Sequence, residues 1–507
     1  MAVRDRRQAW RPKGLFSGCT QADRLTDRSR SEFANGADSR VVDRTVRTIL
    51  APLRALITIC LVLSLLLPLL SVTTASRVRA QDRPLPLIRD AEIEHILATF
   101  AKPLFRAANL DDRVARTYIV NDSSLNAFVA GGQRIFVFTG LILEAELPRE
   151  LVGVLAHETG HIRGGHLSRT ANAISGAQTL AIIGALLGGI AAAATGQGQA
   201  AGAIISGGSA IGTQTFLAYS RTQESAADQA GVELMEAAGW SPRGLVEFLR
   251  VLDEQDFLRG ARDQSPYMRT HPLSFDRIEA LEHRVEQSPL RDREDPPELV
   301  RAYNLMRAKL SGFVRKPQQT LQDYPAADVS DVARYARSVA FMRLGRTDDA
   351  LAEIDHLIER NTANPYFVEL RGQILLEGGR VPESLPPLRD AVARIEHPAV
   401  TVMLAQALVA NDTPETDTEA LDLLQAVTRE EPDNSGAWRQ LAIIHGRRGD
   451  IGLSMLASAE QYFFNGQIDY AGEQASRALG KLPKGSPDYY RALDIQNAVN
   501  TVRQRQR

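Results

Sequence analysis

Two histidines that lie four residues apart, with a glutamate beside the first, could bind and use a metal ion. They are His157 and His161 in the pattern H-E-x-x-H, and the glutamate is Glu158. The stretch 147–169 predicts a helix, because apolar residues recur at helical spacing and Pro148 suits a first helical position. Residues four apart share one helix face, so both imidazoles can bind one metal ion. Glu158 lies beside that face, where it can take a proton from a water molecule at the metal rather than ligate.

An ordinary polar helix face is the alternative interpretation, since H-E-x-x-H also arises by chance in long chains. On a buried helix, two histidines and a glutamate would all need polar partners, which makes that alternative costly. A longer pattern with a third histidine would place it at position 167, which is Leu167. We therefore interpret His166 as a structural residue rather than a ligand.

A helix further along the chain offers the third protein ligand that two histidines leave missing. The stretch 219–239 has amphipathic periodicity, and Glu224 and Asp228 share one of its faces. We expect Glu224 to bind the metal and Asp228 to orient a histidine through its other ring nitrogen. A solvated acidic face is the alternative, although the alanines between the two carboxylates favour a tightly packed neighbourhood.

Composition narrows the choice of metal and of protein class. The chain of 507 residues has a formal net charge of -2 and 24% charged residues, which indicates no preference for nucleic acid or acidic substrates. Its two cysteines, Cys19 and Cys60, precede the expected mature start. The mature chain then has no disulfide, no thiolate site and no cysteine nucleophile. Histidine and carboxylate ligands remain, and they suit one zinc ion (Zn²⁺) per chain.

The N-terminal part predicts export. Residues 1–47 are rich in Arg, Asp and Ser, and we interpret them as disordered or as an over-extended reading frame, with a functional arm as the alternative. Residues 48–80 have the basic flank, apolar core and small-residue end of a signal peptide, with cleavage expected after Ala80 or Ala75. The apolar run 55–72 is almost long enough to span a membrane, so an uncleaved anchor is the alternative.

The segment before the histidine helix predicts a small α+β unit. A helix is expected at 90–105 and a strand at 114–120. The stretch 126–140 contains two strand-like runs around a Gly-Gly pair, which is a hairpin turn signal. A strand in this place can pair with an extended substrate through its backbone. An ordinary hairpin packed on the helix is the alternative.

Residues 171–220 contain no charged residue, and small and apolar residues dominate them. This pattern predicts a helical hairpin, for which three fates compete: a buried core hairpin, a flap over the active site, or a hairpin that contacts a membrane. Each arm has only about 15–20 apolar residues with glycine-rich interruptions, too few for two full spans. We favour the buried or flap-like hairpin.

The C-terminal part predicts helical repeats. Residues 312–330 have the prolines and polar residues of a linker. Within 331–507, Gly345 and Gly379 lie 34 residues apart, each between two amphipathic segments. A period of 34 with helix–turn–helix units is typical of tetratricopeptide repeats, and about four to five helix pairs fit. An unrelated helical bundle is the alternative. The prolines that recur at intervals of 33 and 34 residues are Pro365, Pro398 and Pro432.

Three motifs follow one another along the chain: H-E-x-x-H at 157–161, E-x-x-A-D at 224–228 and T-H-P at 270–272. In combination they resemble a gluzincin family that contains the CAAX prenyl proteases, the membrane heat-shock protease and soluble periplasmic relatives with repeats. The resemblance implies an α+β zincin metalloprotease domain at 81–311. An all-α tetratricopeptide-like superhelical domain would follow it at 331–507.

The resemblance assigns roles within the first two motifs. His157, His161 and Glu224 would bind zinc. Glu158 would be the catalytic base, and Asp228 would complete the catalytic residues.

The resemblance also implies regulatory and substrate-binding residues. His271 resembles a loop histidine that can approach the metal and displace the catalytic water, and Arg277 follows it as in the family's motif. Asn126 and residues 131–138 resemble the family's active-site edge strand. The expected substrate-binding residues are Asn126, Gly131, Gly132, Phe136 and Phe138.

The function that follows from the resemblance is a secreted periplasmic zinc metalloendopeptidase with chaperone-like activity. It would degrade unfolded or misassembled outer-membrane proteins and assist their assembly, docking the β-barrel assembly machinery through its repeats. No nucleic-acid partner is expected, and peripheral membrane contact stays open. One alternative is a chaperone or assembly factor with a restrained protease centre, and another is a membrane-associated protease.

Overall fold

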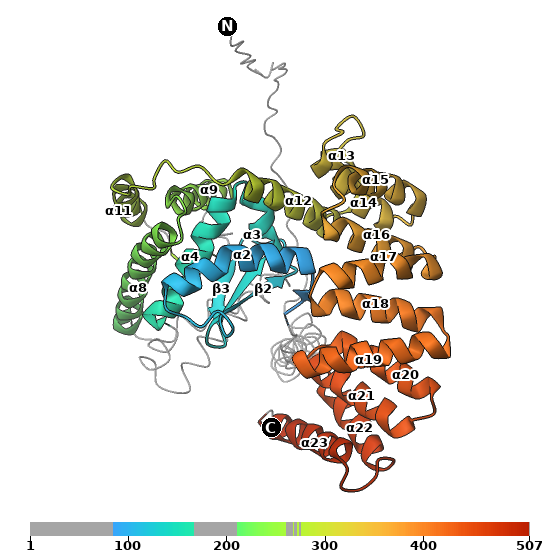
Figure 1. Cartoon of the computed structure of the whole chain (residues 1–507). Helices are drawn as coiled ribbons and strands as arrows, with labels where there is room; N and C mark the ends of the chain where they lie inside the picture. The colour runs from blue at the N-terminus through green and yellow to red at the C-terminus, as the bar shows by residue number, and fades with distance from the viewer. Residues whose placement is uncertain (1–84, 167–209, 260–266, 268–270, 273–274, 506–507) are drawn as a thin grey trace, which may run out of the picture. The chain divides into compact units, whose positions relative to one another are not determined.

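The computed structural model describes residues 85–166, 210–259, 267, 271–272 and 275–505 (Figure 1). The predicted N-terminal extension, the predicted signal peptide and most of the apolar stretch 171–220 lie outside these residues. In the described part, no helix is both long and apolar enough to cross a membrane.

A four-stranded mixed sheet belongs to the first domain, with the strand order β1-β2-β4-β3. β2 and β4 are parallel, whereas β1 pairs with β2 and β3 pairs with β4 in antiparallel fashion. The predicted hairpin is confirmed: β3 and β4 are joined by a tight turn in which Gly131 and Gly132 have φ values of 59° and 95°. The strands are β1 (Leu87–Ile88), β2 (Arg116–Val120), β3 (Ala127–Ala130) and β4 (Arg134–Phe138).

Among the described strands, β1 and β3 lie at the edges of this sheet, and β4 does not. The expectation that 131–138 would form an edge strand is wrong, because β4 lies between β2 and β3 and pairs with both. The backbone N–H of Phe138 donates to the carbonyl oxygen of Asn126 at 3.1 Å. Hydrogen-bonded and non-hydrogen-bonded residues alternate along an antiparallel pair, so the backbone groups of Ala127 and Val129 face away from β4. This side of β3 is covered, because Ala127 is 0% exposed and Val129 is 9% exposed.

Of the described helices that pack with the sheet around one apolar core, four have 17 residues or more and precede residue 260. The predicted helix at 90–105 is confirmed as α2 (Ala91–Ala107), which begins after Asp90, whose carboxylate accepts the N–H of Ile93 at 2.9 Å. The other three are α4 (Pro148–Gly164), α8 (Ala210–Ala237) and α9 (Arg243–Arg259).

The histidine helix α4 is bounded at both ends by local signals. Glu150 accepts hydrogen bonds from the backbone N–H groups of Glu146 at 2.6 Å and Leu147 at 3.2 Å, as a capping residue does. Gly165 has a φ of 62° and ends the helix in a left-handed conformation. The helix therefore stops before the predicted end at 169.

Small residues let α4 approach its neighbours closely. A Cβ atom at Gly160 would lie 2.8 Å from the carbonyl oxygen of Ala227 on α8. A Cβ atom at Gly153 would lie 2.7 Å from the Cα atom of Leu245 on α9. The face of α4 that carries the histidines is thereby packed directly against α8.

The remaining helices complete the first domain and begin the second. The segment 312–330, predicted as a linker, contains the end of α12 and the short helix α13, which starts at Pro317 because proline suits a first helical position. These helices are α3 (Thr139–Glu144), α11 (Phe275–Glu286), α12 (Pro297–Val314) and α13 (Pro317–Asp323).

Consecutive helix pairs follow, as the 34-residue period predicts. Gly345 and Gly379 occupy the turns inside the first two pairs with φ values of 70° and 75°, and Pro365 and Pro398 open two of the helices. The fold class, an α+β domain followed by an all-α repeat domain, is confirmed. The helices are α14 (Asp331–Arg343), α15 (Thr347–Arg360), α16 (Pro365–Glu377), α17 (Val381–Arg394), α18 (Pro398–Asn411), α19 (Pro414–Glu430), α20 (Ser435–Arg447), α21 (Ile451–Phe464), α22 (Ile468–Leu479) and α23 (Pro487–Arg505).

A buried ion cluster connects α2 with the first repeat helices. Lys309 on α12 is 1% exposed. Its Nζ atom lies 2.9 Å from Asp90 Oδ2 and 3.4 Å from both Glu92 Oε2 and Glu369 Oε2. The hydroxyl of Tyr335 donates to Glu92 at 2.6 Å. The start of α2 and the helices α12, α14 and α16 thus share one set of buried charges.

Candidate active site and metal centre

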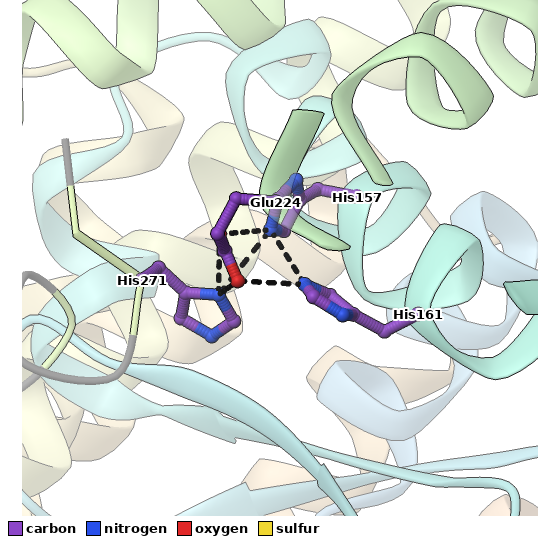
Figure 2. Close-up of side chains that lie close together, drawn as sticks. All are labelled: His157, His161, Glu224 and His271. Carbon is purple, nitrogen blue, oxygen red and sulfur yellow. Dashed lines mark hydrogen bonds and ion pairs between the residues drawn. The ribbon is translucent and has the colours of Figure 1, made fainter. Parts of the chain in front are cut away.

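The two histidines of α4 meet the glutamate of α8 in a buried cluster. The Nε2 atoms of His157 and His161 lie 3.0 Å apart. Each is 3.4 Å from a carboxylate oxygen of Glu224. Figure 2 shows these side chains directed toward one another from the two helices. The helical spacing within α4 and the close packing of α4 on α8 therefore place the two histidines and Glu224 as the sequence predicts.

His271 reaches the same cluster from the segment before α11 (Figure 2). Its Nδ1 atom lies 3.3 Å from His157 Nε2 and 3.1 Å from Glu224 Oε2. Among the described residues, one ligand atom each from His157, His161, Glu224 and His271 lies within 4.8 Å of the others. All four side chains are buried.

The donor set fits a metal ion such as zinc. Three imidazole nitrogens and one carboxylate oxygen converge, and nitrogen and oxygen donors of this kind are what Zn²⁺ prefers when thiolates are absent. These polar side chains are buried close to one another, and burying them without a compensating partner costs free energy. A shared cation would be such a partner. His157, His161 and Glu224 would hold the ion, and His271 lies where a fourth ligand could bind.

Glu158 lies at the edge of the cluster and is 1% exposed. Its Oε1 atom has no hydrogen-bond partner in the described part of the chain. That atom lies 3.4 Å from Nε2 of His271. A buried carboxylate oxygen with free lone pairs beside a metal-binding cluster is suited to accept a proton.

Asp228 contacts the imidazole of His157 on the side that faces away from the cluster, and Arg277 in turn contacts Asp228. Oδ1 of Asp228 lies 2.9 Å from Nδ1 of His157, so the other ring nitrogen of His157 is left to face the cluster. Arg277 donates to Asp228 Oδ1 at 2.8 Å, and its Nη1 lies 3.1 Å from Glu224 Oε2. Burial alone would raise the pKa of Asp228, but hydrogen bonds with Arg277 and His157 outweigh this effect and lower the pKa to about 2. Asp228 is therefore an anion that can hold His157 in place.

Two residues that contact the cluster were not assigned a role there from the sequence. Tyr267 stacks on the ring of His271 with centroids 4.6 Å apart, and its backbone N–H donates to the carbonyl oxygen of Leu125 at 3.3 Å. His166 places Nδ1 2.9 Å from Nδ1 of His161. A single loop tyrosine carries no sequence signal, whereas the Gly-Gly pair before His166 is a signal for a chain reversal.

The expected substrate-binding residues are spread over three places. Asn126 precedes the edge strand β3 and is fully buried, with neither side-chain amide atom hydrogen-bonded in the described structure. Gly131 and Gly132 form the hairpin turn. Phe136 and Phe138 lie on the inner strand β4 and pack with Val120 and Phe128 in a separate apolar cluster. The structure thus does not place these five residues along one edge.

Comparison with known proteins shows which family the first domain matches. Residues 88–285, which contain every residue of the cluster, match the model of peptidase family M48. This segment is an M48 metalloprotease domain. The chain is 24% identical to the β-barrel assembly-enhancing protease of Escherichia coli K12 over 79% of this chain and 82% of the relative. It is 26% identical to a putative β-barrel assembly-enhancing protease of Vibrio cholerae, over 74% of this chain and 77% of the relative.

Another metalloprotease aligns with a smaller share of the chain. The metalloprotease LoiP of Escherichia coli K12 is 26% identical over 39% of this chain and 72% of its own length. The similarity to the β-barrel assembly-enhancing proteases is longer, at 411 aligned residues, and therefore includes repeat helices as well as the M48 domain. The prediction of a metalloprotease is confirmed.

Proposed function

We propose that this chain is an exported zinc metalloendopeptidase of the periplasm that cleaves unfolded or misassembled outer-membrane proteins and assists their assembly. The observation that carries the proposal is the length of the similarity, since 79% of the chain aligns with a protease named for β-barrel assembly. A segment with the pattern of a signal peptide at 48–80 supports export. The repeats supply a surface for the substrate or the assembly machinery.

The buried cluster accounts for peptide-bond hydrolysis. When bound by His157, His161 and Glu224, zinc would polarise the scissile carbonyl and acidify the attacking water. Glu158 accepts the proton of that water through Oε1, which has no hydrogen bond in the described residues, and returns it to the leaving amine. Asp228 and Arg277 keep His157 oriented during this exchange.

The edge strand β3 would hold the substrate. The backbone groups of Ala127 and Val129 face away from β4 but are buried, so an extended peptide would pair with them by β-augmentation once that side of the strand is uncovered. Such pairing reads the backbone and so accepts many sequences, which suits a protease for unfolded chains.

A second function, a chaperone with a restrained protease centre, is favoured by the position of His271. Its Nδ1 lies among the ligand atoms, and its Nε2 lies 3.4 Å from Glu158. An imidazole in this place occupies the fourth position that a catalytic zinc site keeps open. Proteolysis would then require that the segment carrying His271 moves away.

The experiment is cleavage of an unfolded outer-membrane protein by the mature chain, with the same protein folded in detergent as a control substrate. We expect cleavage of the unfolded form only, its loss with a chelator, its return with added zinc, and its loss in Glu158→Gln. Cleavage that persists in both the chelator and Glu158→Gln would contradict a metal-dependent reaction. If the wild-type chain prevents aggregation without any cleavage, the chaperone function is the correct one.

A further inference from the structure

The two proposed histidine ligands each have a partner on the ring nitrogen that faces away from the cluster. For His157 that partner is the carboxylate of Asp228. For His161 it is an imidazole: Nδ1 of His166 lies 2.9 Å from Nδ1 of His161, and the ring centroids are 4.9 Å apart. His166 is 6% exposed. It is therefore a buried, directed partner and not a surface residue.

The chain is built to bring His166 back over the end of α4. Gly165 ends α4 in a left-handed conformation with a φ of 62°. The ring of His166 then covers Gly164, where a Cβ atom would lie 2.4 Å from His166 Nε2 and 2.7 Å from its Cδ2. Any side chain at position 164 would thus displace the imidazole. The side chain of Gln223 on α8 donates to the carbonyl oxygen of His166 at 3.5 Å.

The contact between the two imidazoles restricts their tautomers. Nε2 of His161 faces the cluster, so it must carry a lone pair for a metal and the proton must sit on Nδ1. Nδ1 of His161 then donates a hydrogen bond, and Nδ1 of His166 must accept it. Without an acceptor at this place, the Nδ1–H of His161 would be buried without a partner, which is costly.

We propose that His166 is a positioning residue for the metal centre, which holds His161 in the ring orientation and tautomer that binds zinc. The inference rests on the proposed zinc site. His166 acts through His161 and touches neither the metal nor the substrate. The M48 domain would then use two different partners for its two histidine ligands, an anion for His157 and a neutral imidazole for His161.

Three variants at position 166 separate positioning from packing. His166→Asn keeps an acceptor oxygen near the place of Nδ1, His166→Leu has a similar volume without an acceptor, and His166→Phe keeps the ring without an acceptor. We expect the Leu and Phe variants to bind zinc about 10- to 100-fold more weakly, as loss of an outer partner typically does, and the Asn variant to stay close to wild type. A packing role predicts the opposite order, with Phe close to wild type and Asn weakened.

The measurement is zinc affinity of the mature chain by competition with a chromogenic chelator. The absorption bands of bound Co²⁺ report the ligand geometry without reference to activity. Thermal unfolding of each metal-free variant verifies that it is folded. Gly164→Ala should also weaken zinc binding, because it displaces the ring of His166, and it should have no further effect in a His166→Ala background.

The outcomes separate the two proposals. If the wild-type chain binds no zinc, the proposed metal centre itself is wrong. If the wild-type chain binds zinc and His166→Leu and His166→Phe bind it equally well, with unchanged Co²⁺ spectra, the positioning role of His166 is wrong and the zinc site stands.

Discussion

Glu158 and Glu224 are both buried beside the same histidines, but their surroundings differ. Burial alone would raise the pKa of Glu224, but the imidazoles of His271, His157 and His161 outweigh this effect and hold the pKa well below its usual range. Glu224 is therefore an anion with several positive or polar partners. Oε1 of Glu158 has no hydrogen-bond partner in the described residues. One glutamate is thus surrounded as a ligand would be, and the other is free to exchange a proton.

The first prediction concerns the division of roles between these residues. Replacing His157, His161 or Glu224 by alanine should abolish zinc binding, because a site with three protein ligands has none to spare. Glu158→Gln should keep the metal and lower turnover by about 10²- to 10⁴-fold, the usual contribution of a general base. Bound metal and peptide cleavage are measured on the same samples. A metal-free Glu158→Gln variant together with a metal-loaded His157→Ala variant would reverse the assignment.

The second prediction is that His271 restrains proteolysis. His271→Ala should raise cleavage of an unfolded substrate without lowering bound zinc, because three ligands remain and the fourth position opens. His283→Ala, at an exposed position on the neighbouring helix α11, is the control and should change neither quantity. If His271 instead stabilises the transition state, its loss lowers turnover. The sign of the change in activity decides between these roles.

Among the elements, the crossing of α4 and α8 sets the geometry of the centre. The two histidines come from one helix, and their spacing follows from helical periodicity. The distance to Glu224, by contrast, depends on how closely a second helix can approach. Gly160, inside the H-E-x-x-H pattern, permits that approach because its Cα atom faces the backbone of Ala227.

The third prediction follows from this contact. Gly160→Ala should destabilise the chain by about 1–3 kcal/mol through overpacking, and it should weaken zinc binding because α8 and Glu224 are pushed away. Gly446→Ala in α20 is the matched control, since a Cβ atom there meets only Ser454 Oγ at 3.4 Å. The control should leave zinc binding unchanged and stabilise its helix by about 0.5–1 kcal/mol. Unchanged zinc affinity in Gly160→Ala would show that the crossing tolerates the methyl group.

The sequence predicts those parts of the site that depend on local spacing. His157, His161, Glu224 and Asp228 could be found because helical periodicity determines which residues share a face. The contact of His166 with His161 could not be predicted in this way, because it depends on the left-handed conformation of Gly165 at the end of α4. The assignment of the edge to β3 also required the structure, because strand order depends on the parallel pairing of β2 with β4.

At the scale of the whole chain, the charges around Lys309 link the catalytic domain with its repeats. Lys309 faces the carboxylates of Asp90, Glu92 and Glu369. Glu92 also accepts a hydrogen bond from the hydroxyl of Tyr335. The cluster contains more acids than bases, so one of the acids is expected to hold a proton. Burial raises the pKa of Glu369 to about 7, with the charge of Lys309 opposing the shift.

The fourth prediction is that Lys309→Met destabilises the chain by about 3–5 kcal/mol, because it leaves buried carboxylates without a cation. Lys484→Met, at an exposed position, should change the free energy of unfolding by no more than about 0.5 kcal/mol. Denaturant unfolding measures both variants. Equal stability of Lys309→Met and the wild type would show that the carboxylates are already neutral.

The fifth prediction is a pH dependence of the same junction. The folded-state pKa of Glu369 lies above its unfolded value of 4.5, so its contribution to stability is fully present below pH 4.5 and is lost as the pH rises through about 7. Glu369→Gln mimics the protonated acid and should flatten this part of the stability profile. Thermal unfolding from pH 4.5 to 8 checks it, with the exposed Glu396→Gln as the control that keeps the wild-type slope.

The four-residue edge strand β3 has a further consequence for which molecules the enzyme could attack. A chain that pairs with Ala127 and Val129 must offer backbone N–H and C=O groups that nothing else has taken. A finished β-barrel offers none, because closure pairs every strand with two neighbours and leaves no edge. If the proposed function is correct, an outer-membrane protein becomes resistant to the protease when its barrel closes. The protease then needs no recognition sequence to distinguish a stalled chain from an assembled one.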